Sequence, residues 1–158
     1  GFLYAGLMIK NNEPYLIEYN IRMGDPECQV ILPRLKTDIV QIFKSSISNK
    51  LRNLKIIWRE QKSMTIVLCS KGYPKKYRKN LRIKNIAKLR LLKTDYIYHA
   101  GTKLLNNKLV SNGGRVLNVT SIGNNFLGIR KRIITIIKNL GWKEGFYRKD
   151  IGWKVINK

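Results

Sequence analysis

The sequence contains few of the residues that build disulfide scaffolds, zinc sites and membrane spans. Among its 158 residues are two cysteines and one histidine. Cys28 and Cys69 are too few for a disulfide framework and lack zinc-ligand spacing, so we expect reduced thiols. No apolar run is long enough to cross a bilayer. The apolar residues 1–9 are too short for a signal peptide and follow no basic region. These absences predict a cytoplasmic protein with no membrane partner.

The length and composition predict a packed protein that is part of something larger. A hydrophobic share of 44% is typical of globular proteins. The length allows one ordinary domain, or one small domain plus part of another. The sequence starts at Gly1 rather than at a methionine, and it opens directly in a strand-like segment with no upstream partner. We therefore expect the C-terminal part of a longer protein.

Acidic residues are scarce, which leaves a formal net charge of +23 from 32 basic and nine acidic side chains. One interpretation is a basic, non-enzymatic nucleic-acid-binding module, because lysine and arginine release counterions from phosphates. The other is compositional drift, since Lys, Ile and Asn share AT-rich codons and are over-used together. The densest basic patch is Lys71–Arg82, and no long uninterrupted basic block occurs. We favour drift, and expect no nucleic-acid partner.

The first third of the chain predicts a β-hairpin followed by two helices. Asp25 is expected to cap the first helix, with Pro26 as its first residue. Thr37 is expected to cap the second helix. The predicted elements are strands at 2–9 and 15–20 around a turn at 11–14, a short helix ending at Pro33, and a helix with an apolar stripe at Ile39, Val40, Ile42, Phe43 and Ile47.

A polar stretch at residues 46–53 predicts a domain boundary, which divides the chain into domains 1–52 and 53–158. The clearest helix of the second domain is Phe126–Leu140, which Gly141 ends. Its predicted buried face comprises Ile129, Ile133, Ile136, Ile137 and Leu140. Strands are predicted at 64–69, 96–99, 103–105 and 115–121, with a turn at 112–114 between the last two; residues 83–92 fit either a short helix or a loop.

The most informative segment is Glu18–Gln29. Side chains alternate along a strand, so Glu18, Asn20 and Arg22 are expected on one face. Carboxylate and amide oxygens are ligands that Mg²⁺ accepts, and a guanidinium neutralises phosphate. This pattern predicts a site for a divalent cation that carries a phosphate group.

Residues Arg22–Glu27, within this segment, resemble a known family signature. In phosphoribosylamine–glycine ligases (glycinamide ribonucleotide synthetases) an Arg and a bulky apolar residue precede Gly-Asp-Pro-Glu, as they do in Arg22–Glu27. Met23 stands where Phe or Leu is expected, which conserves volume and hydrophobicity. Five further segments resemble the family in its order: Val30–Lys36, Gly72–Pro74, His99–Thr102, Asn112–Leu117 and Arg148–Trp153.

This resemblance implies an ATP-grasp enzyme. The implied reaction joins glycine to 5-phosphoribosylamine, and ATP becomes ADP and phosphate through a glycyl phosphate. The implied fold class is α+β: residues 1–52 end an ATP-grasp domain with a hairpin and helices, and residues 53–158 form a small, mainly antiparallel β domain with one packed helix, like the C-terminal domain of biotin carboxylase.

The resemblance also implies roles for four residues. Glu18 and Asn20 match the family's Mg²⁺ or Mn²⁺ ligands, and Asn20 and Arg22 would bind the nucleotide. Arg22 and Asp25 are the candidate catalytic residues. Two alternatives stay open: Arg22 could form a salt bridge with Asp25 or Glu27, and Asp25 could cap the helix as well as orient phosphoribosylamine.

Other polar motifs have weaker claims to function. His99 is expected to be a packed or hydrogen-bonding residue rather than a catalytic one, and Asn112–Arg115 could either cradle a phosphate or form a plain turn. Lys149 and Asp150 form either a surface pair or a clamp that fastens the tail. No Gly-rich phosphate loop followed by lysine occurs, so the chain alone should be inactive. Activity would need the N-terminal part of the enzyme. The complete enzyme is expected to be a monomer. Alternatively, the chain could be a decayed remnant, or one half of a split enzyme whose N-terminal part is a separate chain.

Overall fold

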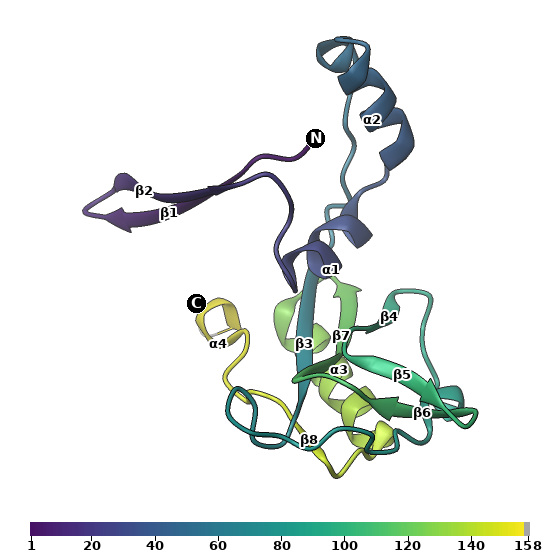
Figure 1. Cartoon of the computed structure of the whole chain (residues 1–158). Helices are drawn as coiled ribbons and strands as arrows, with labels where there is room; N and C mark the ends of the chain where they lie inside the picture. Colours follow the sequence, from purple (N-terminus) through teal and green to yellow (C-terminus); the bar gives the residue numbers. More distant parts are fainter. Residues whose placement is uncertain (157–158) are drawn as a thin grey trace. The chain divides into compact units, whose positions relative to one another are not determined.

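A computed structural model describes residues 1–156 and divides the chain into two compact units, residues 1–59 and residues 60 onward (Figure 1). The boundary expected from the sequence followed Arg52, somewhat earlier in the chain. Both units combine antiparallel strands with short helices, which confirms the predicted α+β class. Within residues 1–156 no helix is both long and apolar enough to cross a membrane.

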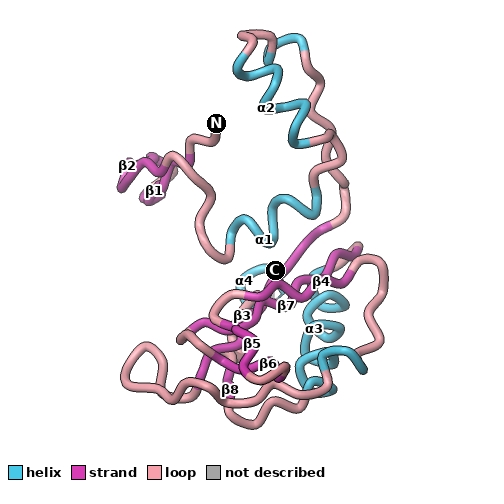
Figure 2. Tube along the Cα trace, turned by 45° about the vertical axis from the view of Figure 1, so that its right-hand side comes forward, coloured by secondary structure: helices cyan, strands magenta, loops and turns pink. Residues whose placement is uncertain are grey.

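The first unit is a β-hairpin followed by helical segments, as predicted (Figure 2). The strands pair in antiparallel fashion around a turn at Asn11 and Asn12. Its elements are β1 (Tyr4–Lys10), β2 (Glu13–Asn20), α1 (Glu27–Ile31), a 3₁₀ helix (Leu32–Arg34), α2 (Ile39–Ile47) and a second 3₁₀ helix (Leu51–Asn53).

Both predicted helix caps of this unit are wrong. Pro26 is the N-cap residue of α1, no side chain caps that helix, and Asp25 instead accepts a hydrogen bond from Gln29 Nε2 at 2.9 Å. In α2 the cap is Asp38, whose carboxylate accepts hydrogen bonds from the backbone amides of the first turn. Thr37 Oγ1 accepts one from the Ile57 backbone amide at 2.7 Å. Pro33 likewise does not end the first helix directly, since it lies within the 3₁₀ helix that continues it.

The first unit has no hydrophobic core of its own. No residue among 1–59 is buried, and many large apolar side chains are exposed. Both faces of the hairpin carry them, and so does α2. The most exposed examples are Leu3, Ile17, Tyr19, Ile21 and Ile47. Apolar surface on both faces is typical of strands that lie inside a larger sheet.

The second unit is built on a four-stranded antiparallel sheet with strand order β4-β7-β3-β8. The long strand β7 lies between β3 and β4, and α3 packs against β3 and β7. A separate hairpin, β5–β6, follows β4 in the chain. The elements are β3 (Lys62–Ser70), a 3₁₀ helix (Ile86–Lys88), β4 (Asp95–His99), β5 (Thr102–Leu105), β6 (Lys108–Ser111), β7 (Arg115–Gly123), α3 (Phe126–Leu140), β8 (Gly145–Phe146) and α4 (Trp153–Ile156).

The core of the second unit lies between this sheet and α3. Alternate residues of β3 (Met64, Ile66 and Leu68) are buried there, as the period of two along a strand requires. The buried face of α3 is the predicted one, and Gly141 ends the helix in the left-handed conformation at φ 60°. Asn125 caps its first turn through a 2.7 Å bond from the Gly128 amide.

Two strands of this unit were missed, β6 and the two-residue β8. The sequence predicted a direct turn from residues 103–105 to residues 115–121, but β6 lies between them and pairs with β5. The hairpin turn is formed by Asn106 and Asn107, both of which have positive φ. Residues 83–92, left open by the sequence, form one turn of 3₁₀ helix and otherwise irregular chain.

Asparagine takes the left-handed turn positions throughout residues 1–156. Seven non-glycine residues there have positive φ, and all seven are asparagines. Asparagine tolerates this conformation better than other side-chain-bearing residues, because its short amide can bond the local backbone. The asparagines are Asn11, Asn12, Asn49, Asn80, Asn85, Asn106 and Asn107.

Candidate functional site

The two side chains expected to bind a metal lie together on β2. Asn20 Nδ2 donates a hydrogen bond to Glu18 Oε1 at 2.9 Å. Because the two residues are two apart on a strand, both project from the same face. The bond uses the amide nitrogen as donor, which leaves Asn20 Oδ1 as an acceptor. The pair therefore presents carboxylate and amide oxygens on one side of the hairpin.

A β-bulge sets what lies opposite this pair. From the turn, β1 and β2 pair regularly until Leu7 meets Leu16, and the register then shifts by one. Glu18 is consequently opposite Gly6, and Asn20 is opposite Tyr4. A Cβ atom on Gly6 would lie 3.2 Å from Glu18 Cγ. The absence of a side chain on Gly6 thus leaves room for the Glu18 side chain to lie across β1.

Tyr4 is a member of the site that the sequence did not reveal. As the cross-strand neighbour of Asn20, it lies on the face that carries the oxygen pair. A side-chain hydrogen bond to Glu27, together with the charges of Glu27 and Glu18, raises the pKa of Tyr4. Tyr4 therefore links the hairpin face to the first residue of α1.

Glu27 also holds the shape of the turn at Arg22–Glu27, which carries the family-like residues and is called the signature turn below. Its Oε2 accepts a hydrogen bond from the Gly24 amide at 3.0 Å, and the Cys28 amide bonds to the Gly24 carbonyl at the same distance. A Cβ atom at Gly24 would lie only 2.5 Å from Glu27 Oε2, so glycine is required for this approach. The negative charge also lies in the first turn of α1, where the helix dipole favours it.

The remaining predicted site residues, Arg22 and Asp25, lie in the turn between β2 and α1. The Arg22 guanidinium donates to the carbonyl oxygen of Met23 at 3.1 Å. Asp25 Oδ1 accepts from Gln29 across one turn of α1. The turn thus holds a cation and two carboxylates within a few residues of the oxygen pair on β2.

The oxygen pair has the chemistry of a magnesium or manganese site. Hard divalent cations take carboxylate and amide oxygens, and Mg²⁺ commonly uses only one or two protein ligands beside phosphate oxygens and water. Within residues 1–156 there is no group of three or more His, Cys, Asp and Glu side chains able to hold a metal ion. Glu18 and Asn20 can therefore hold such an ion only when other oxygens, such as those of a nucleotide, complete its coordination.

Three of the other sequence motifs meet at one end of the sheet in the second unit. The Asn112 amide bonds to the Gly101 carbonyl at 2.7 Å, and Ser70 Oγ bonds to the Gly113 carbonyl at 2.9 Å. A Cβ atom on Gly114 would lie 2.0 Å from the ring of Tyr73. These contacts are those of a tight structural junction between loops.

The remaining motif residues have structural partners. His99 Nδ1 lies 3.0 Å from Thr102 Oγ1, which matches the hydrogen-bonding role expected of it. Arg148 pairs with Asp150 at the surface, and Arg130 bonds the carbonyls of Lys149 and Ile151, which fastens the tail to α3.

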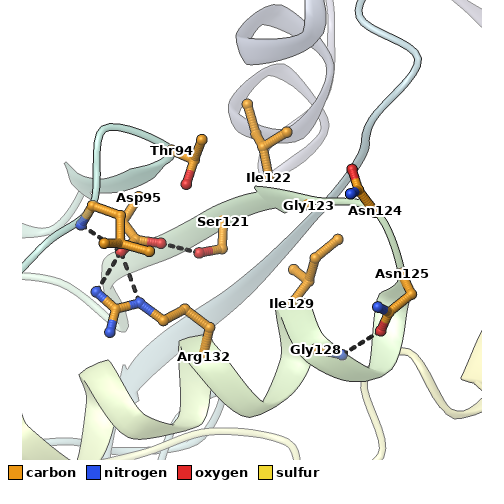
Figure 3. Close-up of a pocket in the computed structure, with 11 residues that line it drawn as sticks. Thr94, Asp95, Ser121, Ile122, Gly123, Asn124, Asn125, Gly128, Ile129 and Arg132 are labelled. Atoms are coloured by element: carbon orange, nitrogen blue, oxygen red, sulfur yellow. Dashed lines mark hydrogen bonds and ion pairs between the residues drawn. The ribbon is translucent and has the colours of Figure 1, made fainter.

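A cavity of about 210 Å³ lies beside the start of α3 (Figure 3). Several of its polar groups are engaged in hydrogen bonds within the fold. Ser121 Oγ and Arg132 both donate to the Asp95 carboxylate, and Asn125 accepts from the Gly128 amide. These groups form an internal network that joins the elements around the cavity.

Comparisons with known proteins agree with this description. Residues 1–28, which carry the hairpin and the signature turn, match the family described as "Phosphoribosylglycinamide synthetase, ATP-grasp (A) domain". Residues 63–154 match "Phosphoribosylglycinamide synthetase, C domain". The hairpin with its oxygen pair thus lies in the part of the chain that matches an ATP-grasp domain. The second match covers more than half of the chain, and the chain belongs to the phosphoribosylglycinamide synthetase family.

Individual relatives support the same assignment. The chain is 44% identical over 156 residues to phosphoribosylamine–glycine ligase of Agrobacterium fabrum. It is 42% identical over 157 residues to the trifunctional purine biosynthetic protein adenosine-3 of Gallus gallus. Each alignment covers 99% of this chain, but 36% and 16% of the respective relative.

A solved structure gives the same result. The crystal structure of phosphoribosylamine–glycine ligase from Thermotoga maritima matches 95% of this chain, with a TM-score of 0.73 and 31% identity. The match covers 36% of that protein, so the chain spans about a third of the ligase. These similarities confirm the family resemblance of the sequence and give no support to the nucleic-acid-binding alternative.

Proposed function

We propose that the chain acts as the C-terminal part of a phosphoribosylamine–glycine ligase in purine biosynthesis. The observation that carries the proposal is the pair Glu18 and Asn20, which share one face of a hairpin and are joined by a 2.9 Å hydrogen bond. The relatives whose names state this activity support it. The reaction joins glycine to 5-phosphoribosylamine with ATP, giving glycinamide ribonucleotide, ADP and phosphate.

In this proposal Glu18 and Asn20 hold Mg²⁺ or Mn²⁺ beside the nucleotide. The ion would offset the repulsion between the triphosphate and the carboxylate of glycine. Arg22, two residues after Asn20 in the chain, carries a permanent positive charge and would bind a phosphate oxygen of the nucleotide during phosphoryl transfer. Asp25, in the turn that follows, orients the amine of phosphoribosylamine toward the glycyl phosphate carbonyl.

Three more residues, Gly6, Gly24 and Glu27, would position the residues of the site. Gly6 leaves space for Glu18, and Glu27 fixes the Gly24 amide so that the turn bearing Arg22 and Asp25 keeps its shape. Near-attack geometry contributes a large part of such a rate enhancement, and small displacements of positioning groups are costly. In this proposal the position of Glu18 depends on Gly6, and the shape of the turn depends on the Glu27 carboxylate.

We infer that residues 1–52 complete an ATP-grasp domain and that residues 53–158 form the C-terminal domain. The exposed apolar faces of the hairpin support this, because an ATP-grasp sheet would cover them. The chain would be inactive without the rest of the ligase. We further propose that the complete ligase is a cytoplasmic monomer.

The test is an ADP-release assay coupled to NADH oxidation, with glycine, ATP and phosphoribosylamine. We expect no turnover by the chain alone, and turnover when the preceding two thirds of a relative's ligase are fused to it or added. The Glu18→Ala variant of the fused protein should lose activity and Mn²⁺ binding together. Turnover by the isolated chain, or Mn²⁺ binding that is equal in wild type and Glu18→Ala, would refute the proposal.

A further inference from the structure

One cavity of the second unit lies away from the motifs discussed so far. Its volume is about 480 Å³, within the range of small-molecule sites. Two segments form it: residues 82–88, which include a 3₁₀ turn, and residues 107–109, which lead from the β5–β6 turn into strand β6. Neither segment belongs to a family-like motif of the sequence or to the hairpin site.

The floor of this cavity is held by backbone pairing. Ile83 donates from its amide to the Leu109 carbonyl at 2.9 Å, and Arg82 pairs with Val110 as an antiparallel bridge. Ile83 is buried in the main core, and Leu109 packs against that core. The segment is therefore bonded to the backbone of β6 at Arg82 and Ile83, which attaches the rim residues to the core.

A turn at Asn85 shapes the rim. Asn85 adopts the left-handed conformation at φ 67°, and its Nδ2 donates to the Leu140 carbonyl at the end of α3. The Lys88 amide closes the turn on the Asn85 carbonyl at 3.0 Å. This turn brings Lys84 and Lys88, on either side of it, to the lining of one cavity.

The lining is strongly cationic and has no acidic residue. Four of its ten residues are basic, compared with 32 of 158 in the whole chain. These four are Arg82, Lys84, Lys88 and Lys108. Asp95 is the single acidic residue between Glu60 and Glu144 in the sequence, and its carboxylate is engaged by Arg132 and Ser121. The lining itself therefore supplies no carboxylate to offset the four cations.

We propose that this cavity binds a small molecule that carries a diphosphate group. Two linked phosphates carry negative charge that complements the four cations of the lining, and lysine and arginine donors are available from both segments. The apolar parts of Ile86 and Leu109, which also line the cavity, leave room for an uncharged remainder of the ligand. The inference is independent of the ligase activity, because the site lies outside the hairpin unit.

Titration of the complete chain with inorganic pyrophosphate tests the proposal. The experiment uses ¹⁵N-labelled protein in 0.15 M NaCl with EDTA, so that no metal ion links pyrophosphate to Glu18 and Asn20. Saturable chemical-shift changes are expected at the amides of residues 82–88 and 107–109. A triple variant, Lys84→Gln with Lys88→Gln and Lys108→Gln, should raise Kd at least about tenfold.

A matched triple variant separates a built site from diffuse positive charge. Lys71→Gln, Lys138→Gln and Lys143→Gln remove the same charge at exposed positions outside the cavity. This control should change Kd less than about twofold, and both triple variants should melt like the wild type. Equal weakening in the two triples, shifts located elsewhere, or no saturable binding by the wild type would overturn the proposal.

Discussion

Arg132 of α3 grips one oxygen of Asp95, donating from Nε at 2.9 Å and from its terminal nitrogen at 2.7 Å. The Asp95 side chain is almost wholly buried, and Ser121 of the neighbouring strand donates to its other oxygen. The carboxylate also accepts the Leu92 amide at 2.8 Å. This one residue therefore joins β4, β7, α3 and the loop before β4 (Figure 3).

Replacing Asp95 by asparagine should destabilise the second unit strongly. The change leaves Arg132 without its charged partner in a largely buried setting, which costs about 3 kcal/mol. For a unit of this size the melting temperature should fall by more than about 10 °C. Asp150→Asn, which breaks the exposed pair with Arg148, is the control and should leave the melting temperature unchanged. Equal melting of the Asp95→Asn variant and wild type in calorimetry would show that the network adds nothing.

The same carboxylate should make stability dependent on acid. Burial alone would raise the pKa of Asp95, but hydrogen bonds from Arg132, Ser121 and the Leu92 amide outweigh it and lower the pKa below its usual 3.8. The stabilisation is therefore fully present above that value and is lost as pH falls from it through the depressed pKa of the folded state. Urea unfolding at pH 7, 5, 4 and 3 should show the difference between wild type and Asp95→Asn shrinking only in the most acid samples. A constant difference across the series would contradict this assignment.

The space at Gly6 should matter for cation binding. A valine there places Cβ 3.2 Å from Glu18 Cγ, so the Glu18 carboxylate must move. We expect Gly6→Val, introduced into the fused ligase, to weaken Mn²⁺ binding by about tenfold, the usual effect of disturbing a ligand's support. Ala5→Val, whose cross-strand partner is Tyr19, is the matched control and should bind Mn²⁺ normally. Electron paramagnetic resonance of free Mn²⁺ measures both, and identical binding by the two variants would argue against crowding at Glu18.

Tyr4 should protect the signature turn. The Glu27 carboxylate, which raises the pKa of Tyr4, also accepts the Gly24 amide, so we expect the Tyr4 hydroxyl to steady it. Tyr4→Phe removes only the hydroxyl, so the Gly24 amide should exchange with deuterium severalfold faster. Tyr15→Phe, on the same hairpin and more than half exposed, should leave this amide unaffected. If the Gly24 amide exchanges at the same rate in both variants, Tyr4 does not stabilise the turn.

The two units should differ sharply in stability. The buried hydrophobic residues all lie in the second unit, whereas none of residues 1–59 is buried. Local opening is easiest where few apolar contacts must break. In hydrogen exchange of the isolated chain, β1, β2 and α2 should exchange early, and β3, β7 and α3 last. A fragment from Glu60 onward should still unfold cooperatively in urea, and its failure to do so would show that the first unit contributes to the core.

Long amphipathic elements were predictable from the sequence because their signal is repeated. The helix Phe126–Leu140 was predicted with its bounds and its five buried residues. Its apolar residues recur at the helical period over fifteen residues, so single exceptions do not obscure the pattern. The strand Lys108–Ser111 was missed because four residues carry too little periodicity. Its flanking Asn106–Asn107 turn lacks the glycine that usually marks a two-residue hairpin.

The site was predictable only in part, for a reason of register. The family signature pointed to Glu18 and Asn20, and alternation placed them on one face. Counting back from the turn, however, would have paired Glu18 with Ala5 and Asn20 with Leu3. The bulge shifts both partners by one, to Gly6 and Tyr4. A single unpaired residue in β2 leaves little trace in a sequence, so the neighbours of Glu18 and Asn20 emerged only from the fold.

The seven asparagines with positive φ bear on how this chain has absorbed its unusual amino-acid usage. Glycine, which suits such corners best, has GC-rich codons, whereas asparagine has AT-rich ones and tolerates the same backbone angles. An exchange of one for the other at a corner alters nucleotide content while the chain keeps its path. Corners of this kind can therefore accumulate mutational bias that the interior of a helix or sheet would not tolerate.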